Sequence, residues 1–279
     1  MWLASAARLV RRTFTAGRIL RIGTALAATE AAFIVLVWIG LTGYYNLRYA
    51  ETILPFLLAG LRGTALFVVV AIPLGFSLGL LMGWARVSRS WYMRAIGSVY
   101  VEFFRGIAPL ALIVFSSIII SALVQRVFYV EDPAAYAIAA GLIALSLHSS
   151  AYQAEILRAG ILSVPTGQVE AAEAIGLTRG RAMVRVTLPQ AFRVSLPALG
   201  NEFASVIKDT SLLSVISALE LSYAGGVRVP SALQLDFNLV FLIWIEVALL
   251  YLVLTFAVTR TVRLVENVSK VPGLEAAEL

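Results

Sequence analysis

The feature that most constrains the fold of this chain is a set of six apolar segments, each long enough to cross a membrane. A helix needs about 20 residues to span a hydrocarbon core of about 30 Å, and these segments are continuous runs of mainly Leu, Val, Ile, Ala and Phe. Membrane-spanning strands would be about 10 residues long with strict alternation. The six segments are 26–45, 55–84, 107–127, 134–157, 194–218 and 237–259. The sequence therefore predicts an all-α integral membrane protein with six transmembrane helices.

The composition agrees with a membrane protein and excludes several kinds of site. Of the 279 residues, 60% are hydrophobic and 14% are charged, which is far from the mixed surface of a soluble domain. The chain has no Cys and one His, so thiolate metal sites and sites built from two histidines are excluded. We therefore expect no metal site, and the motifs considered below predict no catalytic residues.

The basic residues gather on one side of the membrane when the six segments are threaded alternately. Only Arg48, Arg126 and Arg228 fall on the opposite side. The crowded side holds Arg8, Arg11, Arg12, Arg18, Arg21, Arg86, Arg89, Arg94, Arg105, Arg158, Arg179, Arg181, Arg185, Arg193, Arg260, Arg263 and Lys270. By the positive-inside rule this side is the cytoplasm, and both termini are cytoplasmic. The net charge of +6 is thus a consequence of topology and predicts no nucleic-acid partner.

The second segment carries small residues at four-residue spacing: Ala71, Gly75, Gly79 and Gly83. They share one helix face, which lets another backbone approach closely. Two interpretations stay open, packing within one subunit and a seam between two copies.

The longest polar stretch between spans is residues 158–193, which we call the coupling loop. Residues 168–175 favour a helix, and Gly176 is placed to close it in the left-handed conformation. Thr178 can cap a second short helix, which we expect to end at Leu188–Pro189.

Such a helix-turn-helix would project from the bilayer and offer Ala171 and Ala172 as a small, flat face. A projection of this shape suits docking into a groove on a partner. On composition alone, an ordinary solvated loop is the alternative.

The stretch from Glu170 to Pro189 resembles the coupling motif of permease subunits in ABC importers. That motif reads Glu-Ala-Ala, three residues, Gly, nine residues, Ile, any residue, Leu-Pro. The matching residues are Glu170, Ala171, Ala172, Gly176, Leu188 and Pro189, and Val186 stands in place of Ile. The resemblance implies that these residues contact a separate ATPase subunit.

The likeness extends over residues 54–266 to the polar amino acid branch of that family, the histidine- and glutamine-type binding-protein-dependent permeases. It is clearest in Ser150-Ala151-Tyr152, Glu155-Ile156-Leu157-Arg158, Ser163-Val164-Pro165, Gly167-Gln168, Gly200-Asn201-Glu202 and Lys208-Asp209-Thr210-Ser211-Leu212. Val101–Gly106 matches too, but the branch continues Thr-Pro-Leu-Leu-Val-Gln where this chain reads Ile-Ala-Pro-Leu-Ala-Leu. The resemblance implies a five-helix type I core over 54–266, one extra N-terminal helix within 1–53 and a cytoplasmic tail over 267–279.

The resemblance also implies the partners. They are ATPase subunits that carry ATP and Mg, a second permease copy or a related permease, an extracytoplasmic solute-binding protein, and the lipid of a bacterial inner membrane. The chain itself lacks the Gly-rich phosphate loop that ends in Lys-Ser or Lys-Thr, because Lys208 precedes Asp209 and Lys270 precedes Val271. We therefore expect a transport permease that binds no cofactor and is not an enzyme.

Charged residues near the middle of the last two spans are candidates for the solute path. A charge at this depth costs about 2.5–3.5 kcal/mol, so it needs a partner or a wet cavity. A helix break at Pro197 and Gly200 would let the fifth span line such a cavity. The candidates are Asn201, Glu202, Lys208, Asp209 and Thr210. A structural ion pair between Lys208 and Glu246 is the alternative.

The fourth span adds Ser149, Tyr152 and Gln153, which share one helix face. This face could bind the charged groups of an amino acid, or it could serve ordinary bonding between helices. At the cytoplasmic end of the same span, Glu155 and Arg158 are expected to brace the coupling loop.

Two rival functions remain at this point. An ion-coupled secondary transporter would use Asp209 and Glu246 as ion sites. An intramembrane hydrolase would pair His148 with a serine, but Ser149 points away from it and the chain has no Gly-x-Ser-x-Gly. Neither rival explains the coupling motif, and the solute could be a cationic, neutral or acidic amino acid or a derivative.

Overall fold

The computed structural model describes residues 47–128 and 132–269, together with positions 24, 28, 31, 32 and 35. The chain divides into two compact units. The first comprises Met1–Ile53 and Val229–Glu246, and the second comprises Leu54–Arg228 and Val247–Leu279. The domain boundaries expected from the sequence, 1–53, 54–266 and 267–279, remain predictions.

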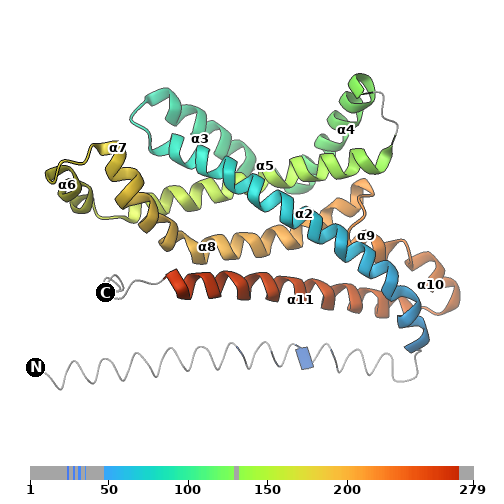
Figure 1. Cartoon of the computed structure of the whole chain (residues 1–279). Helices are drawn as coiled ribbons and strands as arrows, with labels where there is room; N and C mark the ends of the chain where they lie inside the picture. Colours follow the sequence, from blue (N-terminus) through green and yellow to red (C-terminus); the bar gives the residue numbers. More distant parts are fainter. Residues whose placement is uncertain are drawn as a thin grey trace, which may run out of the picture. The chain divides into compact units, whose positions relative to one another are not determined.

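All regular structure in the described part of the chain is helical (Figure 1). The helices are α2 (Leu47–Val87), α3 (Trp91–Gly106), α4 (Pro109–Phe128), α5 (Pro133–Ser163), α6 (Thr166–Ala174), α7 (Arg179–Ala182), α8 (Leu188–Asp209), α9 (Leu221–Gly226), α10 (Val229–Leu235) and α11 (Asn238–Ser269). A π-helical turn (Met183–Thr187) precedes α8, and a 3-10 turn (Thr210–Ile216) follows it.

Four of the described helices, α2, α4, α5 and α11, are long and apolar enough to cross a membrane. Arg179–Ile216 and Leu221–Leu235 supply a fifth if this bent pair forms one span. The last five predicted spans fall on these helices. The first predicted span, 26–45, lies almost wholly outside the described residues and stays a prediction.

The helix α3 was not expected from the sequence. It is amphipathic, because Glu102 and Arg105 interrupt its apolar residues, and it buries only Gly97 and Val101 fully. Because α3 has a polar face, its sequence is not a continuous apolar run of the kind that predicts a transmembrane helix.

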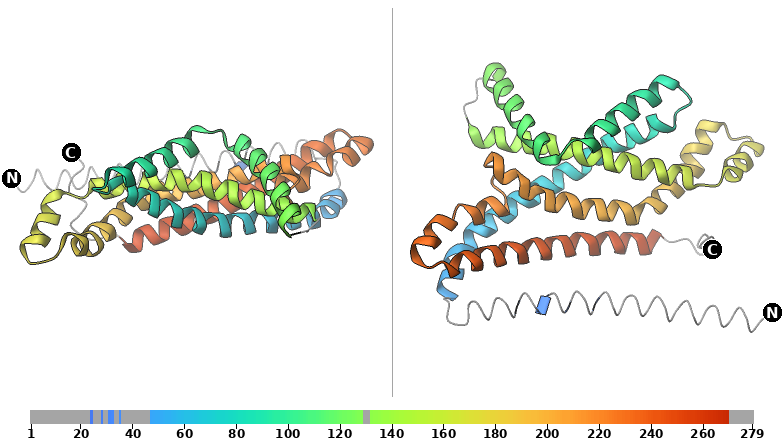
Figure 2. Two further views of the ribbon diagram at one scale, coloured as in Figure 1. Left: turned by 90° about the horizontal axis from the view of Figure 1, so that it is seen from above. Right: turned by 180° about the vertical axis from the view of Figure 1, so that it is seen from behind.

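The centre of the second unit is α5, which packs against α3, α4 and α8. Figures 1 and 2 show α8 running alongside it. The helix begins where the Asp132 carboxylate accepts a hydrogen bond from Ala134 N at 3.0 Å, with Pro133 in the first turn. Ala, Ser and Gly along α5 leave room for neighbouring helices, and five of its polar side chains are buried: Ser146, His148, Ser149, Ser150 and Gln153.

The small face of α2 packs against α5 inside the subunit. A Cβ added at Gly79 would lie 2.9 Å from the Ser150 carbonyl oxygen, and one at Gly83 would lie 2.8 Å from the Ala154 carbonyl oxygen. The interpretation of packing within one subunit is confirmed. The alternative of a dimer seam at these glycines is wrong, because α5 already covers them.

The predicted break at Pro197 and Gly200 is also wrong. The helix α8 continues through both residues and ends at Asp209. Gly200 instead allows a close approach of α11, since a Cβ there would lie 2.7 Å from Cγ1 of Val262. The break comes later, in the 3-10 turn and at Ser217, whose φ is 57°.

Candidate functional site

The coupling motif begins on α6, which projects at one end of the second unit (Figure 1). The helix closes with two hydrogen bonds, from Gly176 N to Glu173 O at 3.0 Å and from Leu177 N to Ala172 O at 3.1 Å. This is the Schellman pattern, which needs a left-handed residue after the helix. Gly176 has a φ of 88°, so the conformation predicted for it is confirmed.

The exposed face of α6 differs from the predicted one. Ala171 is exposed, but Ala172 is only 5% exposed, because it lies on the side of α6 that packs inward. The tip instead presents Glu170, Ala171 and Ile175, and Ile175 is 81% exposed. A large apolar side chain in this position suits contact with a partner.

The second half of the motif does not end a helix. The π-helical turn after α7 runs directly into α8, and Leu188 N bonds to Met183 O, five residues back. Pro189 then falls in the first turn of α8, where a missing N–H costs little. Thr178 precedes α7 as expected, but its side chain makes no capping hydrogen bond.

Leu188 and Pro189 instead line an apolar groove of about 370 Å³ formed by α2, α5 and α8. The other lining residues are Phe76, Leu80, Leu157, Ile161, Ala191 and Phe192. Close by, Gln190 of α8 donates a hydrogen bond to Gln168 of α6. One end of the coupling motif is therefore an exposed tip, and the other end is attached to the membrane helices.

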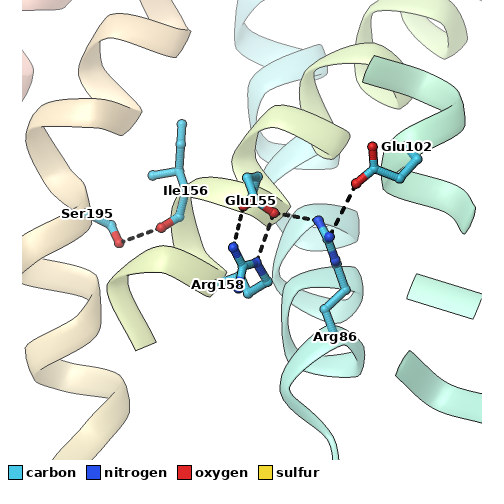
Figure 3. Close-up of polar contacts among 6 residues, drawn as sticks. All are labelled: Arg86, Glu102, Glu155, Ile156, Arg158 and Ser195. Carbon is cyan, nitrogen blue, oxygen red and sulfur yellow. Dashed lines mark hydrogen bonds and ion pairs between the residues drawn. The ribbon is translucent and has the colours of Figure 1, made fainter. Parts of the chain in front are cut away.

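An ion-pair cluster joins three helices at the same end of the unit (Figure 3). The Glu155 carboxylate accepts from Arg86 Nη1 at 2.5 Å and from Arg158 Nε and Nη2 at 3.0 and 2.6 Å. Arg86 also reaches Glu102 at 3.3 Å.

The expectation that Glu155 and Arg158 brace the coupling loop stays a prediction, and the cluster adds contacts to α2 and α3. The partner that Glu155 finds outside α5 is Arg86 of α2, because α2 ends next to α5 at this level. Through Arg86 the cluster also reaches α3. The ion-pair cluster thus connects the ends of α2, α3 and α5. The helix α8 is joined to α5 separately, by the hydrogen bond from Ser195 Oγ to Ile156 O at 3.3 Å (Figure 3).

Three of the predicted path residues meet in the interior between α5 and α8. Ser149 Oγ donates to Glu202 Oε1 at 2.8 Å, and Gln153 Nε2 donates to Ser149 Oγ at 2.8 Å. Gln153 is 0% exposed, and its Oε1 atom has no hydrogen-bond partner among the described residues. A buried acceptor without a partner, next to a carboxylate, is suited to receive a donor from a ligand.

Two further candidates adjoin this group. Tyr152 contacts the ring of His148 with centroids 5.1 Å apart, and the Arg105 guanidinium lies 5.3 Å from the centre of the Tyr152 ring. Asp209 lies within electrostatic reach of His148. A positive charge thus lies near Tyr152, and a negative charge lies near His148 and Glu202.

The remaining path candidates lie apart from it. Asn201 and Lys208 are exposed on other faces of α8. Thr210 is buried, donates to Ile207 O at 2.7 Å, and lies near Tyr251 of α11. Glu246 belongs to the first unit and Lys208 to the second, so the suggested ion pair between them stays a prediction.

Glu220 was not among the residues predicted from the sequence. This carboxylate is 0% exposed and accepts three hydrogen bonds. It was overlooked because the fifth span was taken to end at Ala218, which placed Glu220 in an external loop. A lone acidic residue in the apolar stretch 212–221 is the signal that would have identified it.

Comparison with known proteins gives one family. Residues 71–268 match the model of the binding-protein-dependent transport system inner membrane component. The probable glutamine ABC transporter permease protein GlnM of Bacillus subtilis is 38% identical over 75% of this chain and 90% of its own length. The L-cystine transport system permease protein TcyB of the same species is 40% identical over 76% of this chain and 86% of its own.

A solved structure agrees in both sequence and fold. It is the crystal structure of an amino acid ABC transporter with histidines, which matches 80% of this chain and 98% of its own chain. The TM-score is 0.67 and the sequence identity is 32%.

Proposed function

Because the chain belongs to the family of binding-protein-dependent transport system inner membrane components, we propose that it is the permease subunit of an ATP-driven amino acid importer. The observation that carries this proposal is the coupling motif on an exposed helix tip that ends in a left-handed glycine. The relatives named for glutamine and cystine, and the solved structure with histidines, support an amino acid or a derivative as the solute.

In this proposal the chain transmits force and breaks no covalent bond. Partner ATPase subunits hold ATP and Mg, and the exposed tip at Glu170, Ala171 and Ile175 docks on them. Closure of the ATPases would push α6 and, through Leu188 and Pro189, move α8 against α5. Two permease copies, identical or related, would then alternate between outward and inward access. A solute-binding protein would deliver the amino acid from outside.

The solute path is proposed to run past the interior group of Ser149, Gln153 and Glu202. The Glu202 carboxylate and the nearby Asp209 suit the ammonium or another cationic group of an amino acid. Gln153 Oε1 offers an additional acceptor. Tyr152 adjoins this group on α5, whereas Asn201 and Lys208 of α8 and Thr210 of the 3-10 turn lie apart from it and stay predictions.

The test of the proposed function is uptake by the complete complex in proteoliposomes. The permease is reconstituted with its ATPase so that the ATPase faces a lumen that contains ATP and Mg, and loaded binding protein is added outside. We expect labelled histidine, glutamine or arginine to accumulate only when ATP is enclosed. Accumulation driven by a proton or sodium gradient without ATP would contradict the proposal and favour the ion-coupled transporter that uses Asp209 and Glu246.

A single amide substitution tests the role of Glu202. In Glu202→Gln the Oε1 atom can still accept from Ser149, so the local geometry is kept while the negative charge is lost. Because hydrogen bonds to charged groups contribute about 1.5–3 kcal/mol, we expect uptake of a cationic amino acid to fall about tenfold or more. Initial uptake rates for arginine and for glutamine are compared, and arginine should be affected more.

The matched control for this substitution is Glu102→Gln. Glu102 is an exposed carboxylate on α3, outside the interior group, and it forms an ion pair with Arg86 at 3.3 Å. We expect this variant to transport both solutes within about twofold of the wild type. Equal uptake of arginine by Glu202→Gln and Glu102→Gln would remove Glu202 from the path.

A further inference from the structure

The carboxylate of Glu220 is fully buried just before α9. Its Oε2 atom accepts from Ser222 N at 2.8 Å and from the Tyr251 hydroxyl at 2.6 Å, and its Oε1 atom accepts from Tyr223 N at 2.6 Å. A buried carboxylate that is bonded to three donors on two helices can occupy only one position. Glu220 is therefore an anchor point between α9 and α11.

This anchor lies where the fifth span breaks. The 3-10 turn ends at Ile216, and Ser217 has a left-handed φ of 57°, so the backbone there cannot continue as a helix. At membrane depth such a break is tolerated only when the protein itself satisfies the freed backbone groups. The first N–H groups of α9 are satisfied in this way, Leu221 N by Thr64 Oγ1 at 3.1 Å and the next two by Glu220.

The helix α2 closes the other side of the break. A Cβ added at Gly60 would lie 2.8 Å from the Glu220 carbonyl oxygen and 2.9 Å from Leu221 Cα. A Cβ at Gly63 would overlap the Leu219 carbonyl oxygen. The backbone of residues 219–221 is thus pressed against α2, and Glu220 has no room to shift in that direction.

Tyr251 connects this anchor to the end of the solute path. Its hydroxyl lies 3.3 Å from Ser222 Oγ and 3.5 Å from Thr210 Oγ1. Thr210 directly follows Asp209, and Asp209 is on the same helix as Glu202. One hydroxyl on α11 therefore touches both sides of the break.

We propose that Glu220 and Tyr251 are positioning residues that hold the break in the fifth span and, through Thr210, set the place of Asp209 and Glu202 on the solute path. This inference rests on the proposed function, in which those two carboxylates face the solute. Thr210 donates its proton to Ile207 O and Tyr251 donates its own to Glu220, so the 3.5 Å approach of the two hydroxyls is a packing contact. Without the Tyr251 hydroxyl, the 3-10 turn loses this contact with the Tyr251–Glu220 pair, and the path end of α8 is free to move while the coupling end is unchanged.

The first test does not depend on transport. The chain has no Cys, so the thiol introduced by Thr210→Cys is the only one in the protein. Thr210 is fully buried, and its thiol replacement should react slowly with a maleimide added to the purified permease. We expect Tyr251→Phe to speed this reaction about tenfold, because loss of one hydrogen bond to a buried carboxylate shifts a local equilibrium by about that factor.

The matched control is Tyr136→Phe. The hydroxyl of Tyr136 is also buried but has no hydrogen-bond partner in the described part of the chain, so its removal breaks no bond there. Labelling in that background should equal labelling with the wild-type tyrosine. Equal labelling in the Tyr251→Phe and Tyr136→Phe backgrounds would overturn the positioning role.

The second test separates positioning from general damage. The ratio of ATP hydrolysed to solute imported is measured for the reconstituted complex with loaded binding protein in excess. Fewer folded molecules would lower both quantities together, whereas a displaced path raises the ratio. We expect Tyr251→Phe to raise the ratio of ATP hydrolysed to solute imported about fivefold, and Glu220→Ala to raise this ratio further. Glu220→Gln should raise the ratio less than Glu220→Ala does, because the amide keeps one acceptor oxygen.

An unchanged ratio in Tyr251→Phe would overturn the inference even if total uptake falls. A failure of the proposed function has a different signature. In that case the wild-type complex shows no ATP-dependent uptake, while the labelling difference at position 210 still decides whether Tyr251 holds the break.

Discussion

Replacing Gly176 by valine is expected to abolish ATP-driven uptake while the protein still inserts into the membrane in normal amounts. Gly176 has a φ of 88°, a conformation that costs a residue with a Cβ about 1–2 kcal/mol and is especially poor for a β-branched one. The Schellman bonds that close α6 depend on it. Without them α6 and α7 take another relative direction, and the exposed tip no longer fits its partner.

The matched control is Gly180→Val, four residues further on. Among the described residues, a Cβ at either glycine meets nothing within 4 Å, so neither substitution starts in a crowded place. Gly180 lies in α7 with ordinary helical backbone, where valine is a slightly better helix former than glycine. The two variants therefore differ mainly in the demand for a positive φ.

The measurements are membrane content, co-purification of the ATPase and uptake with enclosed ATP. Gly180→Val should behave like the wild type in all three. Gly176→Val should be present in the membrane but should lose uptake by about a hundredfold and most of its bound ATPase, since a misdirected tip removes the central contact of the interface. Normal uptake by Gly176→Val would contradict docking through α6.

The coupling motif shows which features of a short segment are readable from sequence. The conformation of Gly176 follows from local chemistry, because a glycine at the end of a helical pattern has few alternatives. The burial of Ala172 does not, since Ala171 and Ala172 are chemically identical and only the packing of α6 separates them. Pro189 is similar. A proline in the sequence predicts that a helix does not continue normally through it, but it does not predict the π-helical turn that places Pro189 in the first turn of α8.

The solute path shows the same limit at longer range. That Ser149 and Gln153 share a face follows from helical periodicity, but their meeting with Glu202 depends on how α8 packs against α5. From the sequence, Gly200 is equally compatible with a helix break and with close packing of another helix. The structure shows close packing, against Val262, which lies 62 residues further along the chain. The lone acidic residue Glu220 is readable from the sequence, but its bond to Tyr251 is not, because another helix supplies that partner.

Replacing Gly79 by valine is expected to prevent stable packing of α2 on α5. A Cβ at this position would already lie 2.9 Å from the Ser150 carbonyl oxygen and from Gln153 Cβ, and 3.1 Å from Ala154 N. Two of these atoms are backbone and cannot turn away, so the helices must separate. Overpacking of a tight core costs about 1–3 kcal/mol and occasionally more, and the two further methyl groups of valine place this case at the upper end.

The effect should appear as a fall in the midpoint of unfolding of the detergent-purified protein and in the yield of monodisperse material. The control is Ser77→Val, which puts the same side chain on the exposed side of α2 and removes only a hydrogen bond to Pro73 O within the same helix. That variant should unfold within a few degrees of the wild type, because helix-interior serine-to-backbone bonds contribute little. Since α5 carries Ser149 and Gln153, separation at Gly79 should also disturb the path, and uptake should fall together with stability. If Gly79→Val unfolded at the same point as Ser77→Val, the glycine face would not be the contact that holds α2 in place.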